Sequence, residues 1–284
     1  MAHAHRLKTG DVMILHQNKI NEFTPQDCER YKLDDLSIIC NTPDRFMAKR
    51  KLEDGIDYLL RRKVNFKEDS HQQAYPKFWL LLRANNFTPK RFLLKLGNTV
   101  SAPSGSFYIF LPANTLSHWV LKPGIFDYET FISFRPADKN LPQYPVIFPF
   151  EKAHDINRYD DVVDLLRPYS HGDYVQYSPP SYLADKTKIF IDNYFTESIN
   201  VKDMAKELHI PESSMTISFK DKFGIPPVQY RNILRTFESM RLVKEGRTIT
   251  NAGFDAGFQS LAQYNVHFKR HFNVPPSRFT KLSI

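Results

Sequence analysis

The sequence predicts an α+β protein, with an antiparallel β-barrel in its N-terminal part and an all-α C-terminal domain containing two helix-turn-helix motifs. Short aromatic and aliphatic runs separated by turn residues occur between residues 78 and 134, as in small barrels. A helix, a three-residue turn and a second helix are indicated twice between residues 200 and 276. The 284 residues suffice for two domains. We therefore expect domains at 1–168 and 181–284, joined by a linker at 169–180.

The positive charge of the chain is concentrated in its C-terminal part. The formal net charge is +8, and residues 181–284 contain 15 Lys and Arg against 10 Asp and Glu. This excess suits a partner rich in phosphate, although a solvated surface has the same composition. Two cysteines are too few for a disulfide framework, and no signal peptide or membrane-spanning apolar run is found. We expect a cytoplasmic protein without a membrane partner.

Residues 1–70 carry the weakest pattern, and the sequence predicts little of their structure beyond a strand pair at 6–15. His3, His5 and His16 have no acidic or cysteine partner at a fixed spacing, so we expect no metal site there. Basic runs at 49–51 and 61–63 flank an apolar segment. The first interpretation of such runs is a solvated face, and the second is a nucleic-acid or anion site.

The barrel strands are predicted at 78–82, 91–96, 107–111 and 128–134. A closed barrel of this kind can hold one small molecule in an apolar cavity. The candidate ligand-binding residues are Trp79, Arg83, Lys95 and Trp119. Alternation places Trp79 and Arg83 on one face of their strand, but the sequence does not decide whether that face points inward. For Arg83 and Lys95 the alternative is a solvated charge. His118 has no neighbouring histidine, so we expect neither a metal nor a cofactor.

A segment at 155–169 has apolar residues at helical spacing. They are Ile156, Tyr159, Val162, Val163 and Leu166. Two interpretations stay open for this stripe: a helix that packs on its own barrel, or the seam of a homodimer. The following residues, 170–180, contain Gly, Ser and paired prolines, which is typical of a linker.

Each helix-turn-helix motif is predicted from apolar spacing and from the residues at the helix ends. The expected helices are 201–208 and 212–223 in the first motif, 249–256 and 260–272 in the second, and a joining helix at 230–243. Asn200 followed by Asp203 resembles a capping box, and Thr248 and Ser260 are well placed as N-caps. Gly257 stands where a helix end favours a positive φ. The second helix of such a motif can lie in a DNA major groove.

The stretch from about residue 182 to 282 resembles the DNA-binding domain of the AraC/XylS family of bacterial transcription regulators. The family's F-K-x-x-F-G pattern is present at 219–224 and is followed by Tyr230, with Arg235 five residues further on. Its G-F and F-K-R-x-F-x-x-P-P signatures are present at 257–258 and 268–276.

The sequence departs from the family pattern at three places. Asn273 stands for Gly, Ala252 and Gly253 for Ile and Ala, and Pro211 for a capping Ser. A glycine inside a helix costs about 1 kcal/mol relative to alanine, so we expect a soft helix around Gly253. Asn is the commonest substitute for Gly in the left-handed conformation.

The resemblance also implies an N-terminal fold and a function. Many family members have a cupin-like sensor domain before the DNA-binding domain, and residues 110–112 with His118 and Trp119 resemble one of its hairpins. The implied function is sequence-specific, effector-responsive transcription regulation. Promoter DNA, an unidentified small-molecule effector and RNA polymerase are the implied partners, and no catalysis is implied. A cupin-fold enzyme and a protein-interaction module are the alternatives, although the chain contains no phosphate loop or nucleophile motif.

The DNA contacts are predicted from positions on the second helix of each motif. Base-facing residues are Ser213, Thr216, Ile217, Leu261, Ala262, Asn265 and Val266, and residues near phosphate are Lys220, Lys269 and Arg270. Most of the base-facing side chains are small or apolar, so bidentate Arg–guanine and Gln–adenine pairs are unavailable there. We expect contacts with thymine methyl groups, adenine recognition by Asn265, and an A·T-rich target. Each chain would span two major grooves about 10 bp apart.

Overall fold

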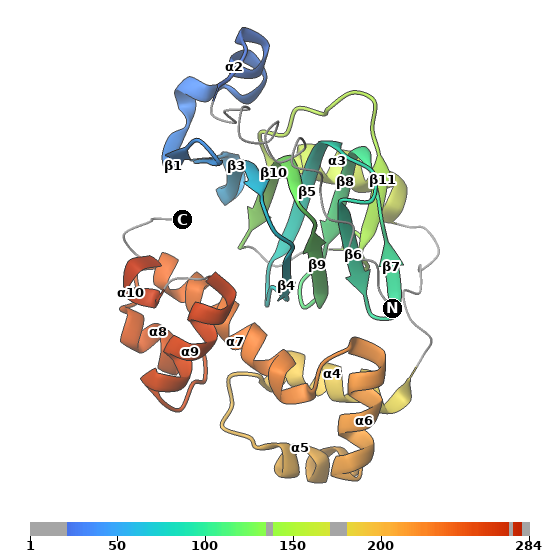
Figure 1. Ribbon diagram of the computed structural model, residues 1–284. Helices are drawn as coiled ribbons and strands as arrows, with labels where there is room; N and C mark the ends of the chain where they lie inside the picture. The colour runs from blue at the N-terminus through green and yellow to red at the C-terminus, as the bar shows by residue number, and fades with distance from the viewer. Residues whose placement is uncertain (1–21, 135–138, 171–180, 273–274, 280–284) are drawn as a thin grey trace.

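The computed structural model describes residues 22–134, 139–170, 181–272 and 275–279 (Figure 1). A β domain is followed by an all-α domain, which confirms the predicted α+β architecture. The predicted strand pair at 6–15, the histidines His3, His5 and His16, and Asn273 lie outside the described residues. So do residues 171–180, which make up most of the predicted linker.

The N-terminal part contains many more strands than the four that the sequence predicts. Its elements are α2 (Pro25–Tyr31), η1 (Leu33–Asp35), β1 (Ser37–Thr42), β2 (Arg45–Lys51), η2 (Glu53–Gly55), β3 (Ile56–Asn65), β4 (Asp69–Gln73), β5 (Trp79–Phe87), β6 (Phe92–Leu96), β7 (Thr99–Ser101), β8 (Gly105–Leu111), β9 (Ser117–Leu121), β10 (Gly124–Ser133), β11 (Val146–Pro149) and α3 (Tyr159–Ser170). The predicted strands correspond to β5, β6, β8 and β10. The basic runs are parts of β2 and β3, where charged residues hide the apolar alternation.

The strands form two antiparallel sheets. Seven strands pair in the order β1-β2-β3-β10-β5-β8-β11, and four pair in the order β4-β9-β6-β7. Strand β10 lies between β3 and β5, so that Tyr128 stands opposite both Arg61 and Ala84. The register therefore places Arg61 on the same face of the large sheet as Tyr128 and Ala84.

The two faces of the large sheet bury different clusters. Leu80 and Leu82 belong to the core between the sheets, where Phe92 of the small sheet contacts Phe107 and Trp119. Trp79, Leu81 and Arg83 alternate with them and so lie on the opposite, outer face. Helix α3 covers this outer face with Val162, Leu165 and Leu166, which share a buried cluster with Trp79 and Leu81. Of the two interpretations for segment 155–169, the structure shows the helix packed on its own β domain.

A buried charged cluster ties the outer face together. The Arg83 Nε donates to Glu129 Oε1 at 2.8 Å, and its Nη1 donates to the His154 carbonyl oxygen at 2.6 Å. The Tyr58 hydroxyl donates to Glu129 Oε2 at 3.0 Å. Glu129 is fully buried and Arg83 is nearly so. Because removing one partner would leave a buried charge unpaired, at a cost of about 3–5 kcal/mol, Arg83 has a structural role.

The helical domain closely follows the predicted elements. Its helices are α4 (Tyr182–Tyr194), α5 (Val201–Leu208), α6 (Glu212–Phe223), α7 (Pro227–Lys244), α8 (Ile249–Asp255), α9 (Leu261–Phe272) and α10 (Pro276–Phe279). The first motif has the predicted bounds, and each helix of the second differs by one residue. The joining helix α7 is longer than predicted and begins at Pro227, because proline at the first helical position is preset for the helix.

Side chains cap the helices as predicted. Asn200 Oδ1 accepts from the Asp203 amide at 2.9 Å, and Thr248 Oγ1 accepts from the Asn251 amide at 3.2 Å. The Ser260 hydroxyl accepts from the Gln263 amide at 3.3 Å. Pro211 provides no side-chain cap to α6. These bonds satisfy amides that helix starts otherwise leave without a partner.

Gly253 has a packing role that the sequence does not reveal. A Cβ built on Gly253 would lie 2.7 Å from Cδ1 of Tyr264, whose ring is buried. The glycine therefore allows α9 to pack closely against α8. The position that the sequence marks as a weakness in α8 is a point of close contact between the two helices of the second motif.

Helix α7 connects the helical domain with the β domain. It packs against α4 and α6 on one side and against α8 and α9 on the other (Figure 1). The Tyr230 hydroxyl donates to the Asn114 carbonyl oxygen at 3.0 Å, and Lys77 pairs with Glu238 at 3.2 Å. The Tyr75 ring meets the Phe237 ring edge-on, with centroids 4.8 Å apart. The helix that holds both motifs is therefore also held by the β domain.

Candidate nucleic-acid interface and interdomain pocket

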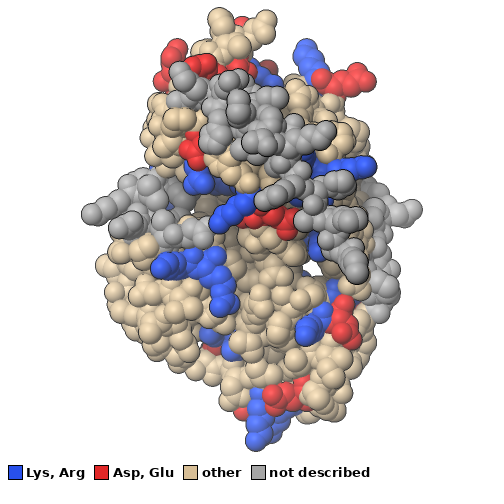
Figure 2. Space-filling view, viewed as in Figure 1, with Lys and Arg blue, Asp and Glu red and all other residues tan. Residues whose placement is uncertain are grey.

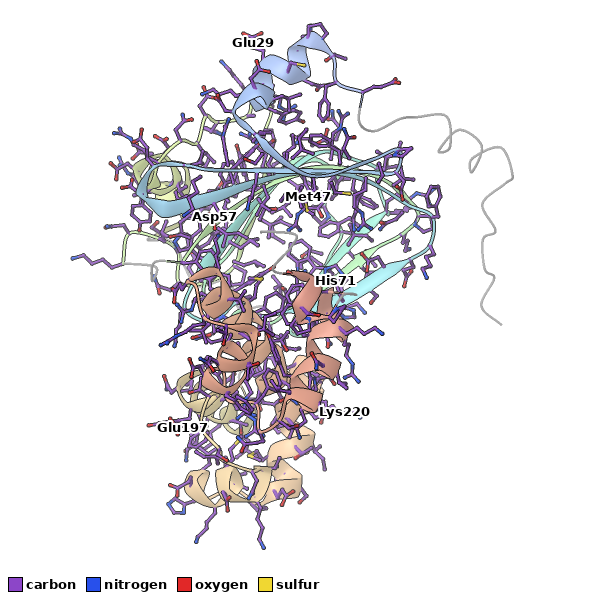
Figure 3. The ribbon with its side chains drawn as sticks, turned by 90° about the vertical axis from the view of Figure 1, so that its left-hand side faces the viewer. Glu29, Met47, Asp57, His71, Glu197 and Lys220 are labelled. Atoms are coloured by element: carbon purple, nitrogen blue, oxygen red, sulfur yellow. The ribbon has the colours of Figure 1, made fainter. Side chains whose placement is uncertain are left out.

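The second helices of the two motifs, α6 and α9, expose the residues predicted to contact DNA. On α6, Ser213, Ile217 and Lys220 are exposed and Thr216 is half-buried; Lys220 is labelled in Figure 3. On α9, the exposed set is Leu261, Ala262, Asn265, Val266, Lys269 and Arg270. The structure places each predicted contact on a surface helix of its motif.

Apolar side chains on the buried faces of α6 and α9 fix which side of each helix is exposed. Met215 and Phe219 of α6 are completely buried, and so, almost, are Tyr264 and Phe268 of α9. The spacing of four residues places each pair on one stripe, and the predicted contacts occupy the other faces. Packing, rather than helix propensity, therefore decides how these helices are presented.

Two large apolar side chains on the exposed faces of α6 and α9 are more than half exposed. Ile217 is 60% exposed and Val266 is 58% exposed. Apolar surface in contact with water is unfavourable, and a bound partner would remove these two side chains from water. Neither side chain can form a hydrogen bond with a base edge, whereas both can contact a thymine methyl group.

Arg235 of α7 anchors the motifs to the start of the helical domain. Its Nε donates to the Phe195 carbonyl oxygen at 2.6 Å, and its Nη2 donates to the Glu197 carbonyl oxygen at 2.7 Å. Burial, with a further contribution from Arg231, lowers the pKa of Arg235 to about 10. The side chain thus binds the carbonyl groups that follow α4 and ties α4 to α7.

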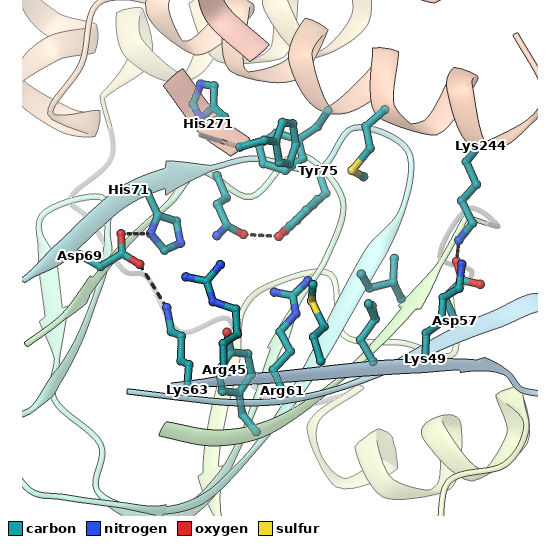
Figure 4. A pocket seen from close by; sticks show the side chains of 18 of the residues that line it. Arg45, Lys49, Asp57, Arg61, Lys63, Asp69, His71, Tyr75, Lys244 and His271 are labelled. Carbon is teal, nitrogen blue, oxygen red and sulfur yellow. Dashed lines mark hydrogen bonds and ion pairs between the residues drawn. The ribbon is translucent and has the colours of Figure 1, made fainter. Parts of the chain in front are cut away.

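A pocket of about 860 Å³ lies between the β domain and the helical domain. Strands β2 and β3 line one side, β4 a second, and α7 and α9 close the third (Figure 4). Met47 on β2 and His71 on β4 come from different walls (Figure 3). In the space-filling view, Lys and Arg side chains lie near the middle of this face of the molecule, with Asp or Glu side chains among them (Figure 2). The volume is within the usual range for small-molecule sites.

The pocket wall continues the inner face of the large sheet. Alternation from the buried Leu59 places Arg61 and Lys63 of β3 on this face, and the register adds Arg45, Met47 and Lys49 of β2. The sheet is therefore apolar where β5 and β8 face the small sheet and cationic where β2 and β3 face the helices.

Hydrogen bonding, burial and nearby positive charge shift the pKa values of two groups in the pocket. Hydrogen bonding to His71, the His71 charge and Lys63 lower the pKa of Asp69 below its ordinary value despite partial burial. Burial, Lys51 and Lys49 lower the pKa of Lys244 to about 8. Perturbation of several groups in one cleft is typical of functional sites.

The candidate ligand residues from the sequence do not line this pocket. Trp79 and Arg83 lie on the outer face of the large sheet, under α3, because alternation along β5 points Leu80 and Leu82 inward. Trp119 is buried between the sheets, where its Nε1 donates to the Ser117 hydroxyl at 2.9 Å. Lys95 is half-buried on β6, opposite His118.

The residues that line the pocket include the two basic runs, for which a solvated face was the first interpretation. Residues 49–51 and 61–63 belong to the lining, together with Arg45, Lys244 and His271. The only signal in the sequence was the second interpretation of these runs as an anion site.

Within the described ranges, no group of three or more His, Cys, Asp or Glu is arranged to hold a metal ion. No helix among the described residues is long and apolar enough to cross a membrane.

Comparison with solved structures gives only partial likenesses. A structure of ToxT from Vibrio cholerae aligns with a TM-score of 0.49 at 15% identity, covering 80% of this chain and 98% of that one. The C-terminal domain of AraT, a response regulator from Geobacillus stearothermophilus, aligns with a TM-score of 0.34 at 16% identity, covering 36% of this chain and 85% of that one.

Comparison with protein sequences identifies the C-terminal domain. An uncharacterized response regulatory protein of Staphylococcus epidermidis is 24% identical over 157 residues, 50% of this chain and 62% of that protein. The transcriptional regulatory protein HptR of Staphylococcus aureus is 26% identical over 91 residues, 32% of this chain and 36% of that protein. The chain thus spans less than two thirds of the length of these curated relatives. A helix-turn-helix domain model matches residues 204–282, so the chain carries an AraC-type helix-turn-helix domain at its C-terminal end.

Proposed function

We propose that this protein is a sequence-specific, DNA-binding transcription regulator that responds to a small-molecule effector. The observation that supports this most directly is the pair of surface helices α6 and α9, each the second helix of its motif and each tied to α7. The relative HptR is named as a transcriptional regulatory protein, in agreement with such a role. The proposed role requires no catalytic step.

The two parts of the chain would divide this work. Residues 181–284 bind promoter DNA, residues 1–168 sense the effector and provide a homodimer contact, and residues 169–180 link them. A regulator that acts at promoters would also have RNA polymerase as a partner. It would meet promoter DNA and RNA polymerase in the cytoplasm. The pocket between the domains supports effector control, because its walls come from both parts of the chain.

Base recognition would depend on apolar contacts and on DNA shape. Ile217 and Val266 are exposed, and both would contact thymine methyl groups, while Asn265 would form a bidentate contact with adenine. Lys220, Lys269 and Arg270 would contact phosphates, which position the helices without reading sequence. These contacts favour an A·T-rich target with two elements about one helical turn apart.

Binding-site selection with the full-length protein at physiological salt tests this proposal. We expect enrichment of two A·T-rich elements about 10 bp apart. Replacing Asn265 by alanine should relax selection at one adenine and cost about 1–3 kcal/mol of discrimination there. Lys152→Gln changes an exposed lysine in the loop before α3 and serves as the control. Enrichment of G·C-rich elements would refute the predicted contacts with thymine and adenine. The absence of any enriched sequence would refute the function.

A further inference from the structure

The cationic wall of the pocket is only partly balanced by acidic neighbours. Across the β2–β3 pairing, Arg45 lies directly opposite Lys63, and Arg61 lies opposite Met47. Like charges placed directly opposite each other destabilise an antiparallel pair. Asp69 pairs with Lys63 at 3.1 Å, but among the described residues neither Arg45 nor Arg61 has an acidic ion-pair partner. A bound anion would remove this repulsion.

The Arg61 guanidinium is only partly satisfied by its neighbours. Its Nε is buried and forms no hydrogen bond within the described structure. Burial alone would raise the pKa of the neighbouring Tyr128, yet Lys63 and Arg61 lower it. The positive charge of Lys63 and Arg61, together with a hydrogen bond from Arg61, therefore outweighs the effect of burial on the Tyr128 pKa. An unsatisfied buried guanidinium nitrogen costs stability unless a ligand accepts its hydrogen bond.

A second cationic group lies at the other end of the same wall. Lys49 and Lys244 approach Asp57 there, and Lys244 forms an ion pair with Asp57 (Figure 4). Lys49 follows Arg45 by four residues on one strand, so their Cα atoms are about 13 Å apart at the usual rise of a strand. The pocket thus has positive charge at two ends of an elongated space.

The middle of the pocket is apolar. Met47 and Leu59 lie between the two cationic ends on β2 and β3, and Ile132 adds to them from β10. Phe237 and Met240 of α7 face them from the helical side. An inorganic anion could satisfy one end but would leave this apolar surface in contact with water.

We propose that the pocket binds an elongated organic anion that has an acidic group at each end and an apolar body between them. This rests on the proposed function, since the ligand would be the effector. Arg45 and Arg61 hold one acidic group, to which a guanidinium can donate two parallel hydrogen bonds. Lys244 and Lys49 hold the other, and the apolar body lies along Met47.

Such a ligand connects the β domain with the helices that hold the DNA-binding motifs. Lys244 is the last residue of α7, and Arg270 of α9 lines the pocket next to Lys269, a predicted phosphate contact. A ligand changes DNA affinity only if it binds the DNA-competent and DNA-incompetent arrangements unequally. A ligand that contacts both β2 and α7 has a different affinity for each arrangement, because these contacts depend on how the helical domain lies against the β domain.

Calorimetric titration of the full-length protein tests the proposal with four probes. They are dodecanedioate, dodecanoate, the uncharged dodecanediol and inorganic pyrophosphate. We expect the diacid to bind at least tenfold tighter than the monoacid, and the diol and pyrophosphate to bind more weakly still. Arg61→Gln and Lys244→Gln should each weaken diacid binding about tenfold, and Lys49→Gln tests the second end without breaking the ion pair to Asp57. The exposed Lys152→Gln is the matched control and should bind as the wild type does.

The outcomes separate this proposal from the proposed function. Equal affinity for monoacid and diacid would overturn the two-ended site, and tightest binding of pyrophosphate would overturn the apolar body. If none of the probes binds while the same protein still selects specific DNA, the ligand class is wrong and the regulator stands. If the diacid binds but no DNA sequence is selected with or without it, the proposed function fails instead.

Discussion

Replacing Gly257 by alanine should destabilise the second helix-turn-helix motif more than the same change at Gly224 destabilises the first. Both glycines follow a helix with positive φ, 97° at Gly257 and 75° at Gly224. A Cβ in this region costs roughly 1–2 kcal/mol at either position. The surroundings differ: nothing lies within 4 Å of a Cβ at Gly224, whereas a Cβ at Gly257 would lie 2.4 Å from the Thr196 carbonyl oxygen.

The magnitude follows from this contact. The Cβ at Gly257 would also lie 2.8 Å from the carbonyl carbon and Cα of Thr196, so the obstacle is backbone and no rotamer change relieves it. Overpacking typically costs about 1–3 kcal/mol. We therefore expect Gly224→Ala to lose about 1–2 kcal/mol and Gly257→Ala about 2–5 kcal/mol. Thr196 follows α4, so relief of the clash moves the second motif away from α4.

Hydrogen exchange of backbone amides in the full-length protein measures both effects. The opening free energy of α8 and α9 should fall in Gly257→Ala, and that of α5 and α6 should fall less in Gly224→Ala. Exchange resolves the two motifs separately, which a single unfolding transition of a two-domain chain does not. Equal losses at the two positions would refute the role of the Thr196 contact.

Three further substitutions test the caps, the DNA contacts and the pH response. Asn200→Ala removes the acceptor of the Asp203 amide and should cost α5 about 1 kcal/mol in exchange experiments, whereas Asn200→Ser should retain the cap. Lys269→Gln should weaken binding to all DNA sequences and reduce the slope of log K against log salt by about 0.9; an unchanged slope would exclude a phosphate contact. Burial lowers the pKa of His271 to about 4, and the ordinary value is about 6.5. The unfolded chain then takes up a proton that the native state does not, so native stability falls as pH falls from about 6.5 to about 4. Over that pH window, the unfolding free energy of His271→Gln should fall by up to roughly 3 kcal/mol less than that of the wild type. Thermal unfolding at a series of pH values measures this, and the same pH dependence in both proteins would contradict it.

The helical domain could be predicted closely because its signals are local. The caps at Asn200 and Thr248 and the turn at Gly257 each act within a few residues, and the structure confirms them. The exposed positions of Asn265 and Lys269 follow from helical periodicity once the buried stripe is known. The resemblance to a regulator family added the proposed function, which periodicity alone does not supply.

The β domain was predicted only where apolar runs are continuous. The sequence pattern does not predict β2 and β3, because their inward residues include Arg45, Arg61 and Lys63. Charged residues at inward positions break the alternation of apolar and polar residues that indicates a strand. The sequence does not decide whether Trp79 and Arg83 point inward from β5, because this depends on what covers each face of the strand. Helix α3 covers their side, so that the opposite face borders the core between the sheets.

By itself the sequence determined the two helix-turn-helix motifs, their end residues and the α+β division, since these depend on neighbours along the chain. Only the tertiary structure decided that β10 lies between β3 and β5, that α7 touches the β domain, and that Lys244 meets the wall carrying Arg61. The physical reason is that strand pairing and domain packing join residues far apart in sequence. Their energies depend on which faces are brought together, and no local pattern encodes that choice.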